Sequence, residues 1–238
     1  MNILVIIPAR SGSKGISNKN IKNFIGKPLM VWSIEQAQKS KYNKNMRIVV
    51  STDSKEYQSI ALGANAECPF LRPVEISGDL STDYECISHC VNYYNKELMY
   101  YPDMILHLRP TQPCRKIYDI DTCIEVFDKN SHKYDSLRTV VELEKTPYKM
   151  YEIENNCLKP LLTEYYEHIE PFNKSRQMFP KVYLHNGYID ILKPALLKEG
   201  KISGLNIYPY VMEKYDTIDI DVEEDWVKAE KQFVYESI

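Results

Sequence analysis

Short apolar runs alternate with longer amphipathic segments along most of the chain. The apolar runs predict buried strands, at residues 3–7, 47–51, 104–108, 136–141, 182–191, 206–210 and 218–220. Segments with apolar residues at every third or fourth position predict helices, at residues 28–39, 55–61, 83–94, 119–128 and 223–235. Strands that alternate with helices are typical of an α/β fold with a mostly parallel sheet, which binds its ligands at the carboxyl ends of the strands.

The alternation stops between residues 142 and 181. Short polar and aromatic segments replace it, and Pro147, Pro160, Pro171 and Pro180 interrupt them. This pattern predicts β-hairpins or irregular arms rather than further strand and helix units. We interpret residues 142–181 as an insertion, and as the candidate dimerisation lobe, within a single domain that spans residues 1–238.

Composition and charge narrow the classes of protein. The 238 residues, with 44% apolar content, are enough to bury one core. With 30 basic and 33 acidic residues the net charge is −3, so no basic surface for nucleic acid is expected. No apolar run approaches the ~20 residues that a membrane helix needs. Met1 and Asn2 lead directly into the first strand without a targeting leader. We therefore expect a cytoplasmic protein that binds neither nucleic acid nor membrane.

The cysteines do not form a metal or redox motif. They are Cys68, Cys86, Cys90, Cys114, Cys123 and Cys157, without a C-x-x-C pair or a histidine cluster beside them. Cys86 and Cys90 are one helical turn apart, as two small buried residues on one helix face would be. We interpret all six as reduced, structural thiols.

A basic loop with two glycines follows the first strand. It reads Pro8-Ala9-Arg10-Ser11-Gly12-Ser13-Lys14-Gly15, and Lys19 and Asn20 come shortly after it. Exposed backbone amides and positive side chains together suit a polyphosphate. On these residues alone, an ordinary basic loop between a strand and a helix is an equal alternative. Neither a Walker A motif nor a complete G-x-G-x-x-G is present, which argues against P-loop kinases and dinucleotide dehydrogenases.

Two carboxylates near the carboxyl end predict a metal site. Asp219 and Asp221 alternate with Ile220 along the predicted short strand, so both carboxylates face one side. Carboxylates that share one face repel each other unless a cation neutralises them, and hard oxygen ligands suit Mg²⁺. A capping role before the last helix is the alternative for Asp221. A haloacid dehalogenase-type phosphatase also uses D-x-D, but it needs far more chain after this motif than the sequence has.

Further motifs follow the first loop along the chain. The loop, with Lys27-Pro28-Leu29 after it, resembles the signature of sugar nucleotidyltransferases, and in particular the acylneuraminate cytidylyltransferases (the CMP-sialic acid synthetases). Other segments resemble motifs of that family in the same order: Val50-Ser51-Thr52-Asp53, Leu71-Arg72-Pro73-Val74-Glu75 with Asp79, Arg109-Pro110-Thr111-Gln112-Pro113-Cys114-Arg115, Arg176-Gln177, Asn186-Gly187, and Ile218-Asp219-Ile220-Asp221 with Asp225-Trp226. The resemblance spans about residues 3 to 230.

The resemblance implies a Rossmann-like nucleotidyltransferase sheet and a role for each motif. Arg10 and the amides of 11–15 would bind the β- and γ-phosphates of CTP, and Lys19 would stabilise the α-phosphate, where charge develops. The catalytic residues implied are Arg10, Lys19, Asp219 and Asp221, with the two aspartates as Mg²⁺ ligands. The nucleotide-binding residues implied are Ala9, Ser11, Gly12, Ser13, Asn20, Arg72, Thr82 and Asp83. A solvated lysine is the alternative for Lys14, and a surface ion pair for Arg72.

The sugar side of the site departs from the family pattern. The residues implied there are Arg109, Gln112, Lys149, Arg176 and Asn186. Lys149 and Arg176 would reach across a homodimer to the carboxylate of an acidic sugar, with solvated arm charges as the alternative. Arg109 stands where the family has a glutamine, and Leu184 replaces an arginine before Asn-Gly, so the sugar is expected to differ. For His185 a substrate contact and a satisfied strand-edge histidine both stay open.

The resulting hypothesis is a cytidylyltransferase. It would join CMP from CTP to the anomeric hydroxyl of an acidic 2-keto-3-deoxy sugar, a nonulosonic acid, and release pyrophosphate with the help of Mg²⁺. Two alternatives remain: a different substrate, such as 3-deoxy-octulosonate or another nucleoside triphosphate, and a non-catalytic nucleotide-binding protein. Neither the particular nonulosonic acid nor a protein general base follows from the sequence.

Overall fold

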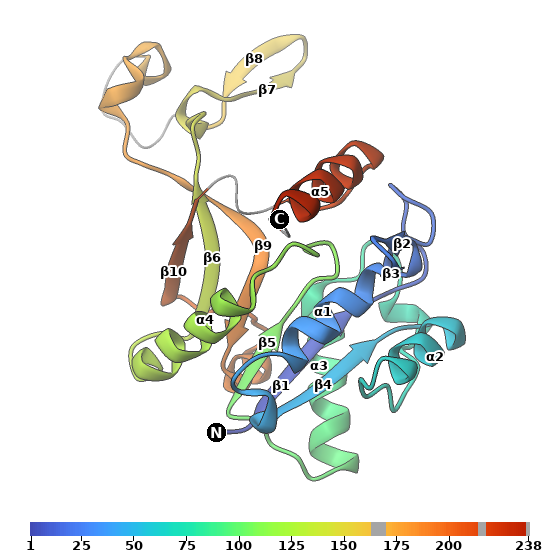
Figure 1. Cartoon of the computed structure of the whole chain (residues 1–238). Coiled ribbons are helices and arrows are strands. Elements are labelled where there is room, and N and C mark those ends of the chain that lie inside the picture. Colours follow the sequence, from blue (N-terminus) through green and yellow to red (C-terminus); the bar gives the residue numbers. More distant parts are fainter. Residues whose placement is uncertain (163–169, 214–217, 237–238) are drawn as a thin grey trace.

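A six-stranded sheet forms the centre of the computed structural model, which describes residues 1–162, 170–213 and 218–236. The strands, in the order in which they lie side by side, are β10 (Ile207–Met212), β6 (Ser136–Glu142), β9 (Tyr183–Leu192), β5 (Met104–His107), β1 (Ile3–Pro8) and β4 (Met46–Ser51). β4, β1 and β5 pair in parallel, as do β6 and β10. β9 runs antiparallel to both β5 and β6. The predicted α/β fold with a mostly parallel sheet is confirmed, with β9 as the exception (Figure 1).

Helices cover both faces of this sheet (Figure 1). They are α1 (Leu29–Gln38), α2 (Lys55–Gly63), α3 (Asp83–Glu97) and α4 (Ile117–Asn130), whereas the last helix, α5 (Glu223–Glu236), packs beyond the sheet. Because successive side chains of a strand point to opposite faces, Ile3, Val5 and Ile7 pack with α1, α2 and α4. Leu4 and Ile6 pack with α3 on the other face. The first strand is therefore buried on both faces, as its continuous apolar run predicts.

Short helical turns connect the main elements. They are η1 (Lys19–Ile21), η2 (Asn43–Asn45), η3 (Val74–Ile76), η4 (Pro147–Lys149), η5 (Pro171–Asn173), η6 (Arg176–Met178) and η7 (Pro194–Glu199). A small antiparallel pair, β2 (Asn23–Phe24) and β3 (Lys27–Pro28), lies between η1 and α1. Within the described ranges, no helix has the length and apolarity needed to cross a membrane.

A third apolar cluster attaches the last helix to the start of the chain. Phe24 and Leu29 pack there with Ile220, Trp226 and Ala229. The predicted strand at 218–220 is wrong: this segment has no strand partner, and Ile220 donates a single backbone hydrogen bond to the carbonyl oxygen of Thr111. Ile220 is nevertheless fully buried. The polar and apolar residues alternate here because the Ile220 side chain is buried against a loop. No neighbouring strand in the described residues provides the ladder of hydrogen bonds that would make this segment a strand.

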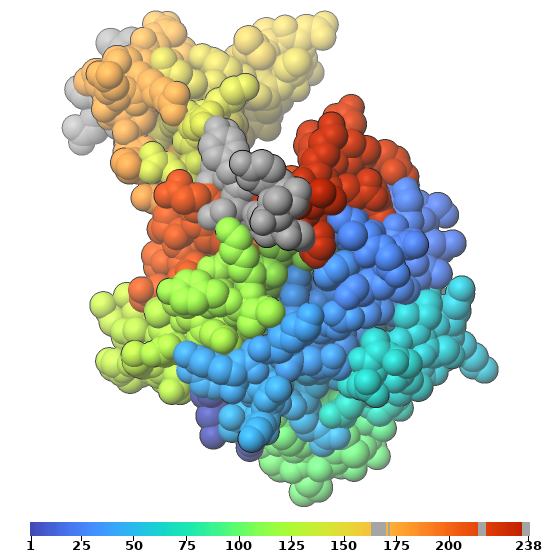
Figure 2. All heavy atoms as spheres, in the orientation of Figure 1, coloured from blue at the N-terminus to red at the C-terminus, as the bar shows by residue number. Residues whose placement is uncertain are grey.

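The described residues of this insertion beyond β6, 143–162 and 170–181, extend as an arm away from the sheet and from α1–α4 (Figures 1 and 2). They contain the hairpin of β7 (Tyr151–Glu154) and β8 (Cys157–Pro160), whose turn residues Asn155 and Asn156 both have positive φ. Several apolar side chains of this arm are exposed, including Ile153, Leu158 and Met178. Exposed apolar surface of this kind is typical of an interaction site. The dimerisation role of the arm stays a prediction.

Candidate active site

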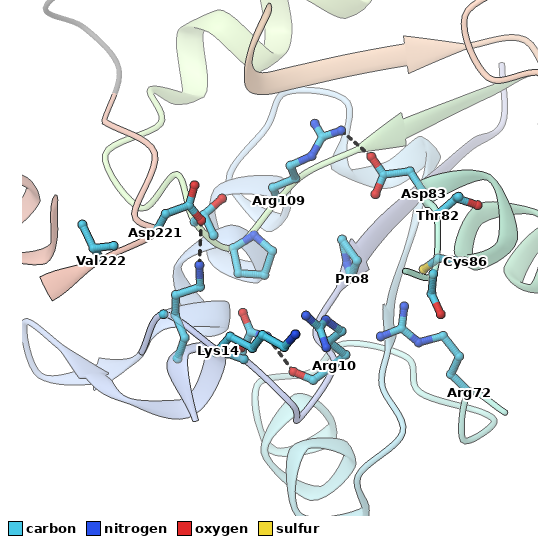
Figure 3. Close-up of a pocket in the computed structure, with 17 residues that line it drawn as sticks. Pro8, Arg10, Lys14, Arg72, Thr82, Asp83, Cys86, Arg109, Asp221 and Val222 are labelled. Atoms are coloured by element: carbon cyan, nitrogen blue, oxygen red, sulfur yellow. Dashed lines mark hydrogen bonds and ion pairs between the residues drawn. The ribbon is translucent and has the colours of Figure 1, made fainter. Parts of the chain in front are cut away.

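A pocket of about 540 Å³ opens at the carboxyl ends of β1 and β5 (Figure 3). Four stretches that are far apart in the sequence line it, within residues 8–20, 72–86, 109–111 and 221–222. The pocket therefore lies where the strand topology places ligand sites in an α/β sheet. Several cationic side chains surround it.

The cations of the first loop face an acidic residue of a different loop. Arg10 Nη1 lies 3.0 Å from Asp79 Oδ1, and Lys14 Nζ lies 2.6 Å from Asp79 Oδ2. The hydrogen bond from Lys14, with a further one from Arg10, holds the pKa of Asp79 below its ordinary value. Asn20, which is buried, donates from Nδ2 to the carbonyl oxygen of Arg10 at 3.0 Å and fixes the loop beneath these cations. One carboxylate thus offsets both positive charges.

The middle of the same loop is held away from the pocket. The backbone nitrogen of Ser11 donates to Asp53 Oδ1, and its hydroxyl donates to Asp53 Oδ2, both at 2.8 Å. Ala9 is buried and donates its N–H to the carbonyl oxygen of Ser51. Of the predicted loop contacts, Arg10 and Ser13 line the pocket, whereas Ala9, Ser11 and Gly12 do not.

Lys19 and Asp221 form the other side of the pocket. Lys19 Nζ donates to Asp221 Oδ1 at 3.0 Å and to the carbonyl oxygen of Ile220 at 2.7 Å, in a largely buried position. Gly15 makes room for this segment, because a Cβ at position 15 would lie only 2.1 Å from the carbonyl oxygen of Asp221. The first loop and the 218–222 segment, more than 200 residues apart, are therefore in direct contact.

Of the two predicted metal ligands, Asp221 lines the pocket and Asp219 does not, although the two charges are close enough to interact. Burial raises the pKa of Asp219, and the neighbouring negative charge of Asp221 raises it further, against hydrogen bonding with Thr111. No cluster of three or more histidine, cysteine or acidic side chains with metal-binding geometry occurs in the described part of the chain. Mg²⁺ commonly uses one or two carboxylates together with substrate phosphates. The mutual repulsion of these carboxylates fits such a site, in which a cation completes its coordination with the nucleotide.

Arg72 lines the pocket from the segment between α2 and η3. The residue is 6% exposed, and neither its Nε nor its Nη2 has a hydrogen-bond partner in the described residues. A buried guanidinium without partners is costly, because burial removes the water that would otherwise bind its N–H groups. Arg72 therefore brings to the pocket wall a positive charge that hydrogen bonds within the described residues do not fully satisfy.

The amino end of α3 lies beside Arg72. Thr82 caps this helix: its hydroxyl accepts from the N–H of Glu85, and the Glu85 side chain accepts from the N–H of Thr82. This capping box fixes the start of the helix at the pocket wall. It also directs Asp83 and Cys86 of the first turn toward the pocket, as Figure 3 shows.

Arg109 is paired within the protein. Its Nη2 lies 2.6 Å from Asp83 Oδ2, and its Nη1 lies 2.7 Å from Asp190 Oδ2 on β9. Although burial opposes it, the ion pairs and a close contact with His185 Nε2, 2.7 Å from Asp190 Oδ1, keep the pKa of Asp190 well below its ordinary value. Arg109 lines the pocket, but two carboxylates compensate its charge. His107 lies beneath this network, and burial lowers its pKa to about 4.

Gln112 and Asn186 contact each other rather than the pocket. Gln112 is buried and donates from Nε2 to the carbonyl oxygen of Asn186 at 2.8 Å. Asn186 Oδ1 accepts from Thr139 Oγ1 and from the N–H of Tyr188. These contacts hold β9 against the 109–115 loop. The predicted sugar contacts of Gln112 and Asn186 therefore lie behind the pocket wall in this structure.

Lys149 and Arg176 are exposed on the arm, and neither lines the pocket of its own chain. The ammonium group of Lys149 lies 5.9 Å from the ring centre of Phe179. The arm extends away from the pocket-bearing part of the molecule (Figure 1). A role for these two cations near a substrate consequently requires the arm of a second copy.

The structure adds pocket residues that the sequence analysis did not assign to the site. Cys86 and Thr111 line the pocket, together with Lys14 and Gly15 of the predicted phosphate loop. Cys86 follows Thr82 by four residues, so the helix-start signal at Thr82 places it in the first turn, on the pocket side. The pairing of Asp79 with the loop cations has no comparable local signal, because the two loops meet only in the folded chain.

Comparisons with known proteins address the identity of this site. The family model described as cytidylyltransferase matches residues 4–237. The chain is 30% identical over 236 residues to the CMP-N,N'-diacetyllegionaminic acid synthase of Legionella pneumophila subsp. pneumophila, and the match covers 97% of this chain and 96% of that protein. It is 31% identical over 232 residues to the N-acylneuraminate cytidylyltransferase of Escherichia coli O18:K1:H7, covering 95% of this chain. The chain spans about half of that relative, 51% of its length.

The fold has a solved counterpart in the CMP:2-keto-3-deoxy-manno-octonic acid synthetase complexed with CTP. The TM-score is 0.72 at 14% identity, covering 99% of this chain and 100% of that one, which establishes a common fold. The match of the family model to nearly the whole chain confirms the resemblance seen in the motifs. The chain belongs to the cytidylyltransferase family and is a nucleotidyltransferase.

Proposed function

We propose that this protein transfers CMP from CTP to the anomeric hydroxyl of a nonulosonic acid and releases pyrophosphate. The observation that carries the proposal is the pocket itself. It collects Arg10, Lys14, Lys19 and Arg72 around a volume of about 540 Å³, with the Asp221 carboxylate at its edge. A cluster of cations beside a carboxylate suits a nucleoside triphosphate that arrives with a divalent cation.

The two ends of the pocket suit the two ends of CTP. Arg72 lines one part of the pocket, and its guanidinium could donate to the O2 and N3 acceptors of cytosine. Arg10 and Lys14 would exchange Asp79 for the β- and γ-phosphates. Lys19 would then lie at the α-phosphate, where a cation stabilises the charge that develops during attack by the sugar hydroxyl.

Asp219 and Asp221 would hold Mg²⁺. The bound ion would neutralise phosphate charge and favour ionisation of the attacking hydroxyl. The protein's own contribution is to hold Asp221 at the α-phosphate side through Lys19 and Gly15. Asp219 would remain beside Thr111, with its charge destabilised until a cation binds.

The proposed sugar is acidic. Relatives at about 30% identity are named for legionaminic and acylneuraminic acids. Within one chain, Asp83 and Asp190 compensate Arg109. The exposed cations Lys149 and Arg176 on the arm are therefore the better candidates for the sugar carboxylate. We accordingly propose a cytoplasmic homodimer in which each arm supplies these two side chains to the site of the other subunit.

A substrate panel tests the proposal. The purified protein is incubated with Mg²⁺, one of CTP, UTP, ATP or GTP, and one of N-acetylneuraminate, diacetyllegionaminate, pseudaminate or 3-deoxy-octulosonate. Pyrophosphate release and the mass of the product are measured. We expect turnover with CTP and a nine-carbon acid, and a product that carries CMP. Preference for 3-deoxy-octulosonate would contradict the proposed sugar, and nucleotide binding without turnover on any sugar would contradict the enzymatic proposal.

A further inference from the structure

Arg72 is a buried cation that no carboxylate accompanies in the described residues. It is 6% exposed, and no acidic side chain lies within ion-pair distance of its guanidinium. Its charge does reach neighbouring groups: it lowers the pKa of His89, after the larger effect of burial. An uncompensated buried charge favours any nearby group that can become anionic.

Cys86 is such a group. It is 2% exposed, it lines the pocket, and Figure 3 shows the Arg72 guanidinium beside it. Cys90, one turn further along α3, and the Arg72 charge lower the pKa of Cys86 to about 7, against burial and the Asp83 charge, which raise it. Burial raises the pKa of Cys90. Of the two thiols, the one that lines the pocket therefore ionises more readily.

We infer that Cys86 is a nucleophilic thiol in the pocket wall and the site at which small soft electrophiles, such as haloacetamides, alkylate this protein. Its thiolate is the counter-ion of Arg72. A small reagent would reach it through the pocket that it lines. This role differs from the structural one expected for all six cysteines.

The reaction is a simple displacement. The thiol loses its proton to solvent, and the sulfur lone pair attacks the CH₂ carbon of iodoacetamide. A carbon–sulfur bond forms, the carbon–iodine bond breaks, and iodide leaves with the bonding electrons. The added acetamide group then occupies the space beside Arg72. Only one consequence rests on the proposed function, namely that this group excludes the base of CTP and that bound CTP protects the thiol.

The experiment compares cysteines within one folded chain. Cys157 is exposed on the arm, so the Cys157→Ser variant removes an ordinary reactive thiol from the background. The variant is treated with iodoacetamide under native conditions, and each site is followed in time by peptide mass mapping. Cys68 is the matched reference, because it is 3% exposed, does not line this pocket, and has a pKa that burial raises to about 11. We expect alkylation of Cys86 at least about tenfold faster than that of Cys68. Equal rates at Cys86 and Cys68 would overturn the inference.

Substitution of Arg72 tests the cause. In the same background, Arg72→Met removes the charge and keeps much of the side-chain volume, whereas Arg72→Lys keeps the charge. We expect about tenfold slower alkylation of Cys86 in the Met variant and a rate within a few-fold of the parent in the Lys variant. A faster alkylation of Cys68 would show that the fold has loosened in either variant. An unchanged rate at Cys86 in the Met variant, with Cys68 still protected, would refute the role of Arg72.

Addition of CTP separates this inference from the proposed function. Protection of Cys86 by CTP, but not by inorganic phosphate, supports both. Rapid, Arg72-dependent alkylation that CTP does not slow leaves the thiol assignment standing and contradicts CTP as the occupant. CTP turnover in a protein whose Cys86 reacts no faster than Cys68 contradicts the thiol assignment alone. Cys86→Ser completes the test, because any pyrophosphate-releasing activity that it retains should resist iodoacetamide.

Discussion

Gly15 and Asp221 are in contact through their backbones, and a Cβ at position 15 would lie 2.1 Å from the carbonyl oxygen of Asp221. The contact places the end of the 218–221 segment against the first loop. Lys19 reinforces it with hydrogen bonds to Ile220 and Asp221. The position of the proposed metal-binding carboxylate therefore depends on the absence of a side chain at residue 15.

Gly15→Ala should reduce turnover much more than stability. The added methyl group must push the Asp221 backbone away, and displacement of a reacting group by about 1 Å can cost on the order of a hundredfold in rate. We expect the rate of CTP-dependent pyrophosphate release to fall at least about tenfold. Gly12→Ala is the matched control, because a Cβ there meets only Arg10 Nη1 at 3.5 Å, an ordinary contact. Equal losses in the two variants would argue against the contact as the cause.

Asp221→Asn should remove most of the activity and change its dependence on Mg²⁺. The amide keeps the shape of the side chain but lacks the charge that pairs with Lys19 and that would bind the ion. We expect a loss on the order of a hundredfold or more in turnover, with a higher Mg²⁺ concentration needed for half-maximal rate. Glu223→Gln, two residues further along, removes a charge that pairs with Lys22 at the surface and should leave both quantities nearly unchanged. Full turnover in the Asn variant would refute the metal role.

Asp79→Asn should tighten the binding of CTP. Asp79 neutralises Arg10 and Lys14 in the ligand-free chain, so the triphosphate has to displace it. Without this competitor we expect the KM for CTP to fall about two- to fivefold, with little change in melting temperature because the pairs are exposed. Glu75→Gln is the matched control, because it makes the same change of charge in the neighbouring turn. A higher KM in the Asp79 variant would instead mean that Asp79 helps to bind the nucleotide.

His107 should make the stability of the fold depend on pH in mildly acidic solution. Burial lowers its pKa from 6.5 to about 4, so between these values the unfolded chain binds a proton that the folded chain does not. Stability therefore falls as the pH drops through this range, by up to about 1.4 kcal/mol per pH unit. Urea unfolding at several pH values between 7 and 4 measures the slope. His107→Gln should flatten it, whatever the variant's stability at pH 7, and an unchanged slope would exclude His107 as its source.

The central sheet shows how far local pattern predicts the fold. The strands near residues 3–7 and 104–108 and the helix from Asp83 were predicted within a few residues, because burial and capping signals are local. The antiparallel direction of β9 carries no such signal, since its long connection through the arm allows either orientation. At 218–220 the local pattern predicted a strand that the fold does not form. A buried Ile220 between two aspartates gives the alternation typical of a strand, but the segment has no strand partner in the described residues.

The site likewise contains features that the sequence predicts and features that only the fold reveals. Arg10, Lys19, Arg72 and Asp221 were predicted from motifs, and the structure brings all four to one pocket. The sequence alone determined the α/β class, the nucleotidyltransferase family and these pocket residues, because periodicity and motif spacing are properties of neighbouring positions. Only the tertiary structure decided which charges are already compensated. Asp79 offsets Arg10, Asp83 and Asp190 offset Arg109, and Arg72 is left with Cys86, because ion pairs and their absence depend on distances between side chains that the folded chain alone brings together.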